Sequence, residues 1–506
     1  MDIILFLCAA VCIICMCLRS LRLASGSRLP PGPRGFPVFG NMFQLGSQAR
    51  SHQGLAKLAA KYGPLMTLRL GCMRTVVVSS SGAAREMFKV NDLSLAGRTV
   101  YEAMKVDVAQ SNNGSIITAQ YGPSWRLLRR LCSREFFTSG QLNAMKTIRN
   151  NCMEDMVRFI REESEHGKKD VEVAKFVFFM NFNLLGNLMF SRNLVDPKSK
   201  EGNEFYALAA KIMEVVAEPN LADFLPLLKP FDLQRIRKKM HYYTEKAFEI
   251  TAGFTRARIQ ASKSKEEREK GKKDFLDVLL NFKDGNGDEL SSFSSESINA
   301  LALEMFIAGT DTTTSVVEWA LAELLHNPQI MNKLLDELSG VAGPDRGIEE
   351  ADLESLPYLR AVVKETLRLH PPLPLMVPHR AMESCTMMGY EIPKHTQVLV
   401  NTWAIGRDPE TWEDPHCFKP ERFLDSAIEY KGQHFEYLPF GSGRRMCPGM
   451  PLAHRLLPLT VAALLLSFDW VLPEGVDPST VDMREKLGIT LRRATPLRAI
   501  PLPRRS

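Results

Sequence analysis

The chain has 506 residues, of which 45% are hydrophobic and 24% are charged, and this composition excludes an intrinsically disordered protein. Its formal net charge is only +6, and no block of lysine and arginine is interleaved with aromatic residues, so we expect no nucleic-acid partner. The length allows three domains or one. Because the body contains no long Ser/Gly-rich or Pro-rich linker, we predict one large domain.

The first predicted element is a membrane anchor. Every residue from Ile3 to Leu18 is apolar, and this run is slightly shorter than the ~20 residues that span a bilayer as a helix. Asp2 precedes the run and the arginines follow it, which is the wrong polarity for a cleavable signal peptide and predicts a cytosolic body. We therefore predict a transmembrane anchor at residues 1–22, a stiff Pro-rich spacer at 23–41 and a catalytic domain at 42–506.

The body is predicted to be mainly helical with a minor sheet. Helices are expected at 51–62, 140–165, 201–217, 233–261, 294–326, 328–338 and 452–468, and strands at 65–70, 75–79, 388–392 and 397–401. Residues 262–274 form a lysine- and glutamate-rich run that we expect to be a solvated loop. Residues 219–230 are apolar and broken by three prolines, which fits either a turn facing the core or a second surface resting on the bilayer.

The strongest chemical signal lies at residues 439–449, where one cysteine, Cys447, is placed among three glycines and two arginines before a predicted helix. Glycines let backbone N–H groups approach the sulfur, and the helix N-terminus together with Arg445 would favour the thiolate. A buried structural cysteine is the competing explanation, which these neighbours outweigh. No second Cys or His stands at zinc spacing, whereas a single thiolate suits haem iron and favours O–O cleavage. We predict that Cys447 is a metal ligand.

This segment resembles the haem-binding loop of the cytochromes P450, and the other motifs follow the order of that family over essentially the whole chain. Residues 404–408 and 482–490 resemble plant microsomal members of the geraniol 8-hydroxylase group. The resemblance implies a P450 fold, mainly α with small β-sheets (α+β), which binds haem b. It also implies NADPH-cytochrome P450 reductase as the electron donor, and a single-pass protein of the endoplasmic reticulum membrane with its catalytic domain in the cytosol.

A second motif lies in the middle of the helix predicted at 294–326. Ala308 and Thr312 are four residues apart and share a face, and Gly309 between them costs about 1 kcal/mol relative to alanine, so it needs a reason. The resemblance implies an oxygen-activation site in which Thr312 hydrogen-bonds dioxygen, Asp311 relays protons, and Ala308 and Gly309 border the haem. Back-bonding of the threonine to the helix beside a surface carboxylate is the competing explanation, and it accounts less well for the whole group.

Further residues are assigned through the same resemblance. Glu365 and Arg368, three apart on a helix, match the family's Glu-x-x-Arg pair with Arg422 as third member, and we expect a structural role for them. The residues expected to hold the haem or its propionates are Trp125, Arg129, His379, Phe440, Arg445 and Gly449. Many relatives carry arginine where this chain has His379. A basic face that could dock an acidic electron donor is expected from Arg126, Arg130 and Arg444.

The segments that would face the substrate are apolar or small, at 100–121, 205–216, 301–309, 373–377 and 487–490. A small lipophilic substrate follows, because an apolar pocket penalises charge. We predict a monooxygenase that oxidises a specialised metabolite, with a terpenoid ahead of a phenolic or an alkaloid. Two alternatives stay open: oxidative coupling or rearrangement without oxygen insertion, and a membrane-tethered haem carrier or sensor, which would not need the Asp311–Thr312 pair.

Overall fold

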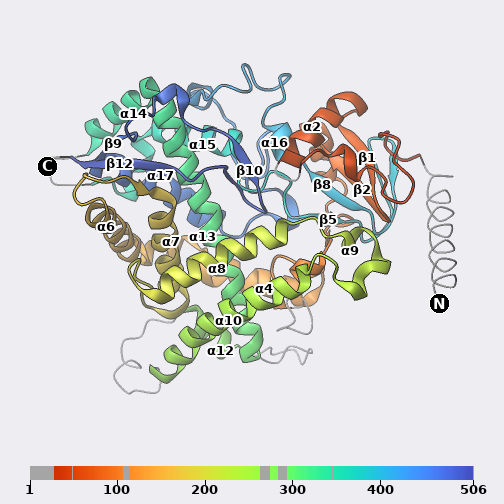
Figure 1. The fold of residues 1–506 in the computed structure, drawn as a ribbon, viewed down its shortest axis with the longest axis horizontal. Helices are drawn as coiled ribbons and strands as arrows, with labels where there is room; N and C mark the ends of the chain where they lie inside the picture. The colour runs from red at the N-terminus through yellow and green to blue at the C-terminus, as the bar shows by residue number, and fades with distance from the viewer. Residues whose placement is uncertain are drawn as a thin grey trace.

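The computed structural model describes residues 28–47, 50–105, 114–261, 274–282, 293–342 and 347–504. Within these residues helices form most of the molecule and the strands gather in four small sheets, so the predicted class, mainly α with small β-sheets, is confirmed (Figure 1). The predicted anchor, the first residues of the spacer and nearly all of the charged run at 262–274 lie outside the described residues.

The largest sheet joins strands from residues 65–98 to strands from residues 379–400. Its five strands have the order β1-β2-β8-β5-β3, and β2 pairs in parallel with β8. A tight turn at Gly71, whose φ is +59°, connects the first two strands, and α2 packs on them through Leu55 and Leu68. The bounds are α2 Ser51–Tyr62, β1 Leu65–Leu70, β2 Met73–Val78, β3 Gly97–Arg98, β5 His379–Arg380 and β8 Gln397–Val400.

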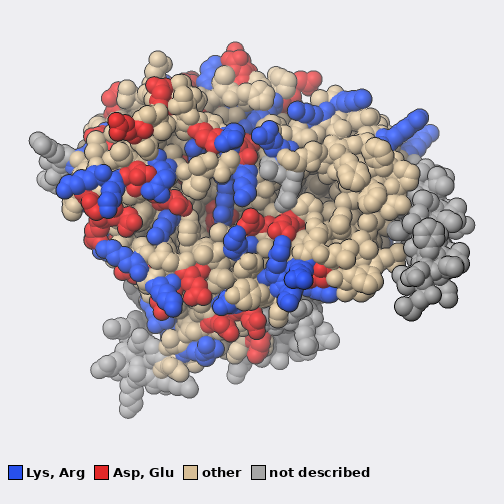
Figure 2. Space-filling model, in the orientation of Figure 1, with Lys and Arg blue, Asp and Glu red and all other residues tan. Residues whose placement is uncertain are grey.

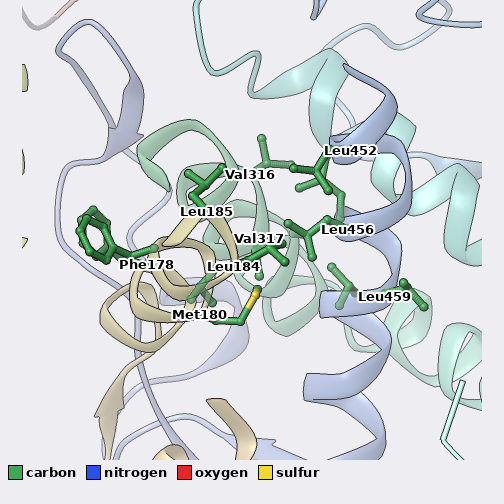
Figure 3. Close-up of a cluster of buried hydrophobic side chains, with 14 of the residues drawn as sticks. Phe178, Met180, Leu184, Leu185, Val316, Val317, Leu452, Leu456 and Leu459 are labelled. Carbon is green, nitrogen blue, oxygen red and sulfur yellow. The ribbon is translucent and has the colours of Figure 1, made fainter. Parts of the chain in front are cut away.

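A central helix, α13 (Ser295–His326), runs through the middle of the body (Figure 1). The helices packed against it include α7 (Val173–Phe190), α10 (Ile236–Ala261), α15 (Pro357–Leu369) and α17 (Met450–Ser467). Figure 3 shows the core where side chains of α7, α13 and α17 meet, among them Leu185, Val317 and Leu456. Of the described helices, α7 and α17 are apolar and long enough to span a membrane. Both nevertheless contribute side chains to this core, and 89% of α7 is buried inside the molecule.

At Gly309 the helix α13 comes close to a side chain of α7. A Cβ atom added there would lie 2.7 Å from Cδ1 of Leu185 on α7. The glycine therefore has a packing reason in addition to the oxygen gap expected from the sequence, because a methyl group there would require the buried Leu185 side chain to move.

Most predicted helices are confirmed within a few residues, but two segments differ. The helix expected at 140–165 is divided into α5 (Ser139–Ala144) and α6 (Lys146–Glu163), because Met145 leaves the helical region with φ −92° and ψ 4°. The proline-rich segment forms the short helix α9 (Leu221–Phe224) and a 3-10 turn at Pro226–Phe231. Leu227 and Phe231 are 55% and 69% exposed, so this turn does not face the core.

The remaining elements surround this frame. The helices are α3 Ser81–Lys89, α4 Pro123–Leu131, α8 Lys200–Ala217, α12 Phe275–Leu280, α14 Pro328–Val341 and α16 Thr402–Ile405. The strands are β4 Val171–Glu172, β6 Cys385–Met387, β7 Tyr390–Ile392, β9 Phe468–Val471, β10 Glu485–Leu487, β11 Leu491–Arg493 and β12 Arg498–Pro503. Of these, β11 matters most for the site, because it crosses α13 beside Asp311.

Candidate active site

Cys447 lies in the loop that enters α17. Its N–H donates to the carbonyl of Phe440 at 3.0 Å, which closes the loop. Gly441 and Gly443 have φ of +71° and +66°, values that residues with a side chain rarely adopt. A Cβ atom at Gly443 would in addition lie 2.3 Å from Oδ1 of Asp92. Two glycines of the motif are thus explained by the backbone path that presents the cysteine.

The electrostatics of the Cys447 sulfur differ from the sequence expectation. Burial raises the pKa of Cys447, while backbone N–H groups of Gly449 and Met450 and the charge of Arg129 lower it in part. Arg129 is therefore the cation that favours the thiolate, in place of the expected Arg445. No described group of three His, Cys, Asp or Glu side chains could hold a metal ion, so a metal here would depend on this one sulfur. A bound cation is what would stabilise the thiolate in so buried a position.

Three arginines converge on the cavity that Cys447 lines. Arg98, Arg129 and Arg445 all border it, and Phe440 and Gly449 lie on the same wall. Burial and the charge of Arg445 lower the pKa of Arg98 to about 9, and burial and the charge of Arg129 lower the pKa of Arg445 to about 10. Mutual repulsion of this kind is relieved by an anion. The cavity is thus built to receive negative charge.

The hydrogen bonds of these residues show which donors stay free. Arg445 donates to the carbonyls of Ala96 and Ala119 at 2.8 and 2.7 Å, but its buried Nη1 has no partner among the described residues. Trp125, by contrast, donates its indole N–H to the carbonyl of Ile116 at 2.9 Å. The ring of Trp125 therefore serves as a platform for Arg445, whose guanidinium lies 4.2 Å from the ring centroid.

His379 does not supply a positive charge. Burial and the neighbouring charges of Arg98 and Arg445 hold its pKa well below its usual range, so the imidazole is neutral. Its Nδ1 lies 2.8 Å from the carbonyl of Leu95, a contact that requires the proton on Nδ1 and leaves Nε2 as an acceptor. The arginine that stands opposite it in the sheet is Arg98, since β3 pairs with β5 in the register Arg98↔His379. Sequence reasoning missed Arg98, which is identified by this cross-strand pairing and by its place on the cavity wall.

The motif on α13 has its two polar side chains in different environments. The hydroxyl of Thr312 donates to the carbonyl of Ala308 at 2.7 Å, as the competing explanation supposes, while its oxygen stays able to accept. Ala308, Gly309 and Thr312 border the Cys447 cavity. Asp311 is buried, pairs with Arg492 of β11 and has no partner for Oδ2 among the described residues. It is therefore no surface carboxylate.

A larger cavity of about 480 Å³ continues from this site. It draws on each of the segments expected to face a substrate, and Glu304 is the one charged side chain on its described wall. The two cavities share the following residues: Ile117, Glu304, Ala308, Thr312, Leu373, Met376 and Val377. A molecule in the larger cavity can therefore reach the space beside Cys447.

A family model described as Cytochrome P450 matches residues 30–497. The chain belongs to the cytochrome P450 family. An iridoid oxidase from Catharanthus roseus is 47% identical over 96% of this chain and 94% of its own length, and a geraniol 8-hydroxylase from Swertia mussotii is 43% identical over 94% of each. A zebra fish cytochrome P450 structure with abiraterone has a TM-score of 0.73 and 28% identity, covering 90% of this chain and all of that one. The expected resemblance to plant geraniol 8-hydroxylases is confirmed.

The residues around Cys447 fit the haem of this family. A haem needs a thiolate ligand and cationic donors for its two propionates, and the cavity offers one sulfur, three arginines and a buried guanidinium nitrogen that has no partner among the described residues. As a P450 the protein is a haem-containing monooxygenase.

The Glu365 cluster lies outside both cavities. Glu365 accepts from Nε and Nη2 of Arg368 at 2.7 and 2.8 Å and from Nε of Arg422 at 3.0 Å. The remaining N–H groups of Arg368 donate to the carbonyls of Gly406, Pro415 and Cys417. This network ties α15 to the segment 406–422, and every group in it already has its partners, which is the pattern of a structural element.

Proposed function

We propose that this P450 oxidises a small, lipophilic terpenoid with O2 and with electrons from NADPH-cytochrome P450 reductase. The observation that carries the proposal is the position of Cys447 beside an apolar cavity of about 480 Å³ that continues into its own. A cavity of this size and composition suits a small apolar molecule with few polar groups. The printed activities of the relatives, iridoid oxidase and geraniol 8-hydroxylase, support a terpenoid.

Each part of the site has a proposed role. Haem, bound through Cys447, would supply oxygen activation, for which an axial thiolate favours O–O cleavage. Arg129 and Arg445, joined by Arg98, would neutralise the propionates. Thr312 would hold a proton at its hydroxyl on the cavity wall, and Asp311, oriented by Arg492, would move protons from the opposite side of α13.

The reductase would dock on a basic face near Cys447. Arg126 and Arg130 are exposed on α4, and Arg444 is exposed in the cysteine loop. The guanidinium groups of Arg126 and Arg444 both approach the ring of Tyr121, at 6.0 and 5.6 Å from its centroid, so they lie together on one face. A positive face of this kind steers an acidic partner by its charge.

The proposed location is the endoplasmic reticulum membrane, with residues 1–22 as the anchor and 23–41 as the spacer. Apolar side chains are exposed both near the spacer and in the turn after α9; they are Phe36, Phe39, Phe43, Leu227, Phe231 and Leu233. Figure 2 shows that the end of the molecule that carries β1, β2 and α9 has few charged side chains. An uncharged, aromatic-rich face beside a membrane anchor supports contact with lipid.

The test uses the full chain in microsomes with a plant reductase, NADPH and geraniol under oxygen-18. We expect substrate-stimulated NADPH consumption and one labelled oxygen in the product. Coupling or rearrangement would give an unlabelled product, and a haem carrier or sensor would consume no NADPH in response to substrate. The matched variant is Cys447→Ala, which should abolish the thiolate-type spectrum of the reduced CO complex; a spectrum that survives would show that another group is the ligand.

A further inference from the structure

Glu304 is the feature of the substrate cavity that the proposed function leaves unexplained. It lies on α13 one turn before Ala308 and two turns before Thr312, so the three residues share a face of the helix. It borders both cavities and is partly exposed, although the residues on either side of it along α13 are buried. A carboxylate in an apolar cavity is costly, so its presence needs a reason.

Glu304 accepts three hydrogen bonds that give it a structural role. Oε1 accepts from the hydroxyl of Ser115 at 2.8 Å and from the N–H of Ile117 at 2.7 Å, and Oε2 accepts from the N–H of Ile116 at 3.0 Å. These contacts hold the segment that follows residue 113 against α13. All three donors are neutral, and the described part of the chain gives Glu304 no cationic partner.

This arrangement leaves a place for one more donor. A carboxylate offers about four lone-pair positions, and the protein fills three of them, with only one donor on Oε2. Burial raises the pKa of Glu304 to about 7, and the three hydrogen bonds lower it only in part. The protein does not fully stabilise the ionised form of this carboxylate. A hydrogen bond donated by a ligand would therefore stabilise that form further.

We propose that Glu304 is a specificity-determining residue that accepts a hydrogen bond from a hydroxyl group of the substrate. This inference rests on the proposed terpenoid oxidation and names the substrate as a terpenoid alcohol. Thr312 lies about 12 Å from Glu304 along α13, at 1.5 Å per residue. With its hydroxyl at Glu304, an elongated alcohol presents its opposite, hydrocarbon end to the space beside Cys447, so oxidation falls at the end remote from the hydroxyl.

The test compares two ligands within each variant of the purified full-chain holoenzyme. Geraniol carries the hydroxyl donor, and geranyl methyl ether lacks it but keeps the carbon skeleton. Wild type should bind geraniol about tenfold more tightly than the ether in a spectral titration, as expected for a hydrogen bond to a charged acceptor. In Glu304→Gln this ratio should fall severalfold, and in Glu304→Ala it should approach one. Displacement of the 115–117 segment could weaken the binding of both ligands. Because both are measured in the same variant, such a common loss of affinity does not change their ratio.

The matched control is Glu318→Gln. Glu318 is another glutamate of α13, with its pKa also raised by burial to about 7, but it is buried in the core, accepts from the N–H of Leu497 and borders neither cavity among the described residues. Its substitution should leave the ratio at the wild-type value. Products give a second readout: wild type should oxidise geraniol at the end remote from the hydroxyl, whereas Glu304→Ala should also form the aldehyde at the alcohol carbon.

Four results would overturn the inference. A ratio that stays at its wild-type value in both Glu304 variants would show a purely structural role. Tighter binding of geranylamine than of geraniol, lost on Glu304 substitution, would show that the site recognises an ammonium group instead. If wild type neither binds nor oxidises geraniol and its ether, the proposed terpenoid oxidation fails and this inference fails with it, whereas turnover of both at equal affinity removes only the role of Glu304.

Discussion

Two glutamates in the interior of this P450, Glu365 and Glu304, show how the surroundings of a carboxylate separate a structural site from a binding site. Glu365 is fully buried and accepts four hydrogen bonds, three from Arg368 and Arg422 and one from the backbone N–H of Lys419, so its lone-pair positions are filled. Glu304 has only neutral donors and lies on a cavity wall. A complete set of cationic partners leaves no position for a ligand, whereas an incomplete set of neutral ones does.

The arginines of the molecule repeat this contrast. Arg368 donates to Glu365 and to three backbone carbonyls, so its guanidinium is saturated. Arg445 donates to two carbonyls and retains a buried Nη1 without a described partner, and this nitrogen belongs to the cavity that Cys447 lines. The saturated guanidinium of Arg368 holds the frame together, whereas the unsatisfied nitrogen of Arg445 in the Cys447 cavity indicates where the haem would bind.

The largest effect is expected when the Glu365 network is broken. Glu365→Ala leaves two arginines without their carboxylate, of which Arg368 is fully buried, and should lower the free energy of unfolding by about 3–5 kcal/mol, with loss of bound haem. Thermal unfolding and haem content measure this. The control is Glu429→Ala, which removes a 37% exposed partner of the neighbouring Lys364 and should cost less than about 1 kcal/mol. Equal losses in the two variants would contradict the contrast between them.

The next effect concerns the acid on α13. Asp311→Asn keeps the shape of the side chain but cannot move a proton, so we expect kcat to fall about 10²-fold with little change in substrate affinity. The comparison variant is Arg492→Gln, which removes the partner of Asp311 and leaves the acid in place. Asp311 itself is buried, so the loss of its partner should cost about 1–3 kcal/mol of stability, but because the acid stays in place kcat should fall far less. Unchanged product formation in Asp311→Asn would remove this residue from proton transfer.

The sequence predicted those parts of the molecule whose signals are local. The long apolar run of α13 with Ser294 at its N-cap, and the cysteine loop with its glycines and arginines, each lie within one continuous segment. Arg98, Arg492 and the contacts of Glu304 could not be found in this way. Their roles depend on partners far apart in the chain, such as Asp311 and Arg492, which are separated by 181 residues, or Glu304 and Ile116, separated by 188.

A smaller change in stability is expected at Gly309. This residue tests how closely α13 packs on α7, on a face of the helix that differs from the face of Glu304. Gly309 is five residues after Glu304, which places it about 140° around the helix, against Leu185 of α7. Gly309→Ala should cost about 1–3 kcal/mol through overpacking, and Leu185→Ala should restore part of this in the double variant. Gly340→Ala on α14 is the control: nothing lies within 4 Å of its added Cβ, so it should stabilise by about 0.5 kcal/mol.

The smallest effect is a pH dependence that belongs to Glu304. Burial raises its pKa in the folded protein from the ordinary 4.5 to about 7, so its contribution to stability is present below ~pH 4.5 and is lost as the pH rises through ~7. Between ~pH 5 and ~pH 8 wild type should lose about 1 kcal/mol of stability relative to Glu304→Gln, since exposure to the cavity moderates the cost of ionisation.

Saturating geraniol sharpens this measurement, because a hydroxyl donor stabilises the ionised carboxylate and lowers its pKa. The difference between wild type and Glu304→Gln should then become flatter with pH. Burial also raises the pKa of Glu318 to about 7, so Glu318→Gln should show the same trend without ligand. Because Glu318 borders neither cavity among the described residues, geraniol should leave its trend unchanged, and flattening in both variants would mean that the alcohol acts through the whole helix instead of through Glu304.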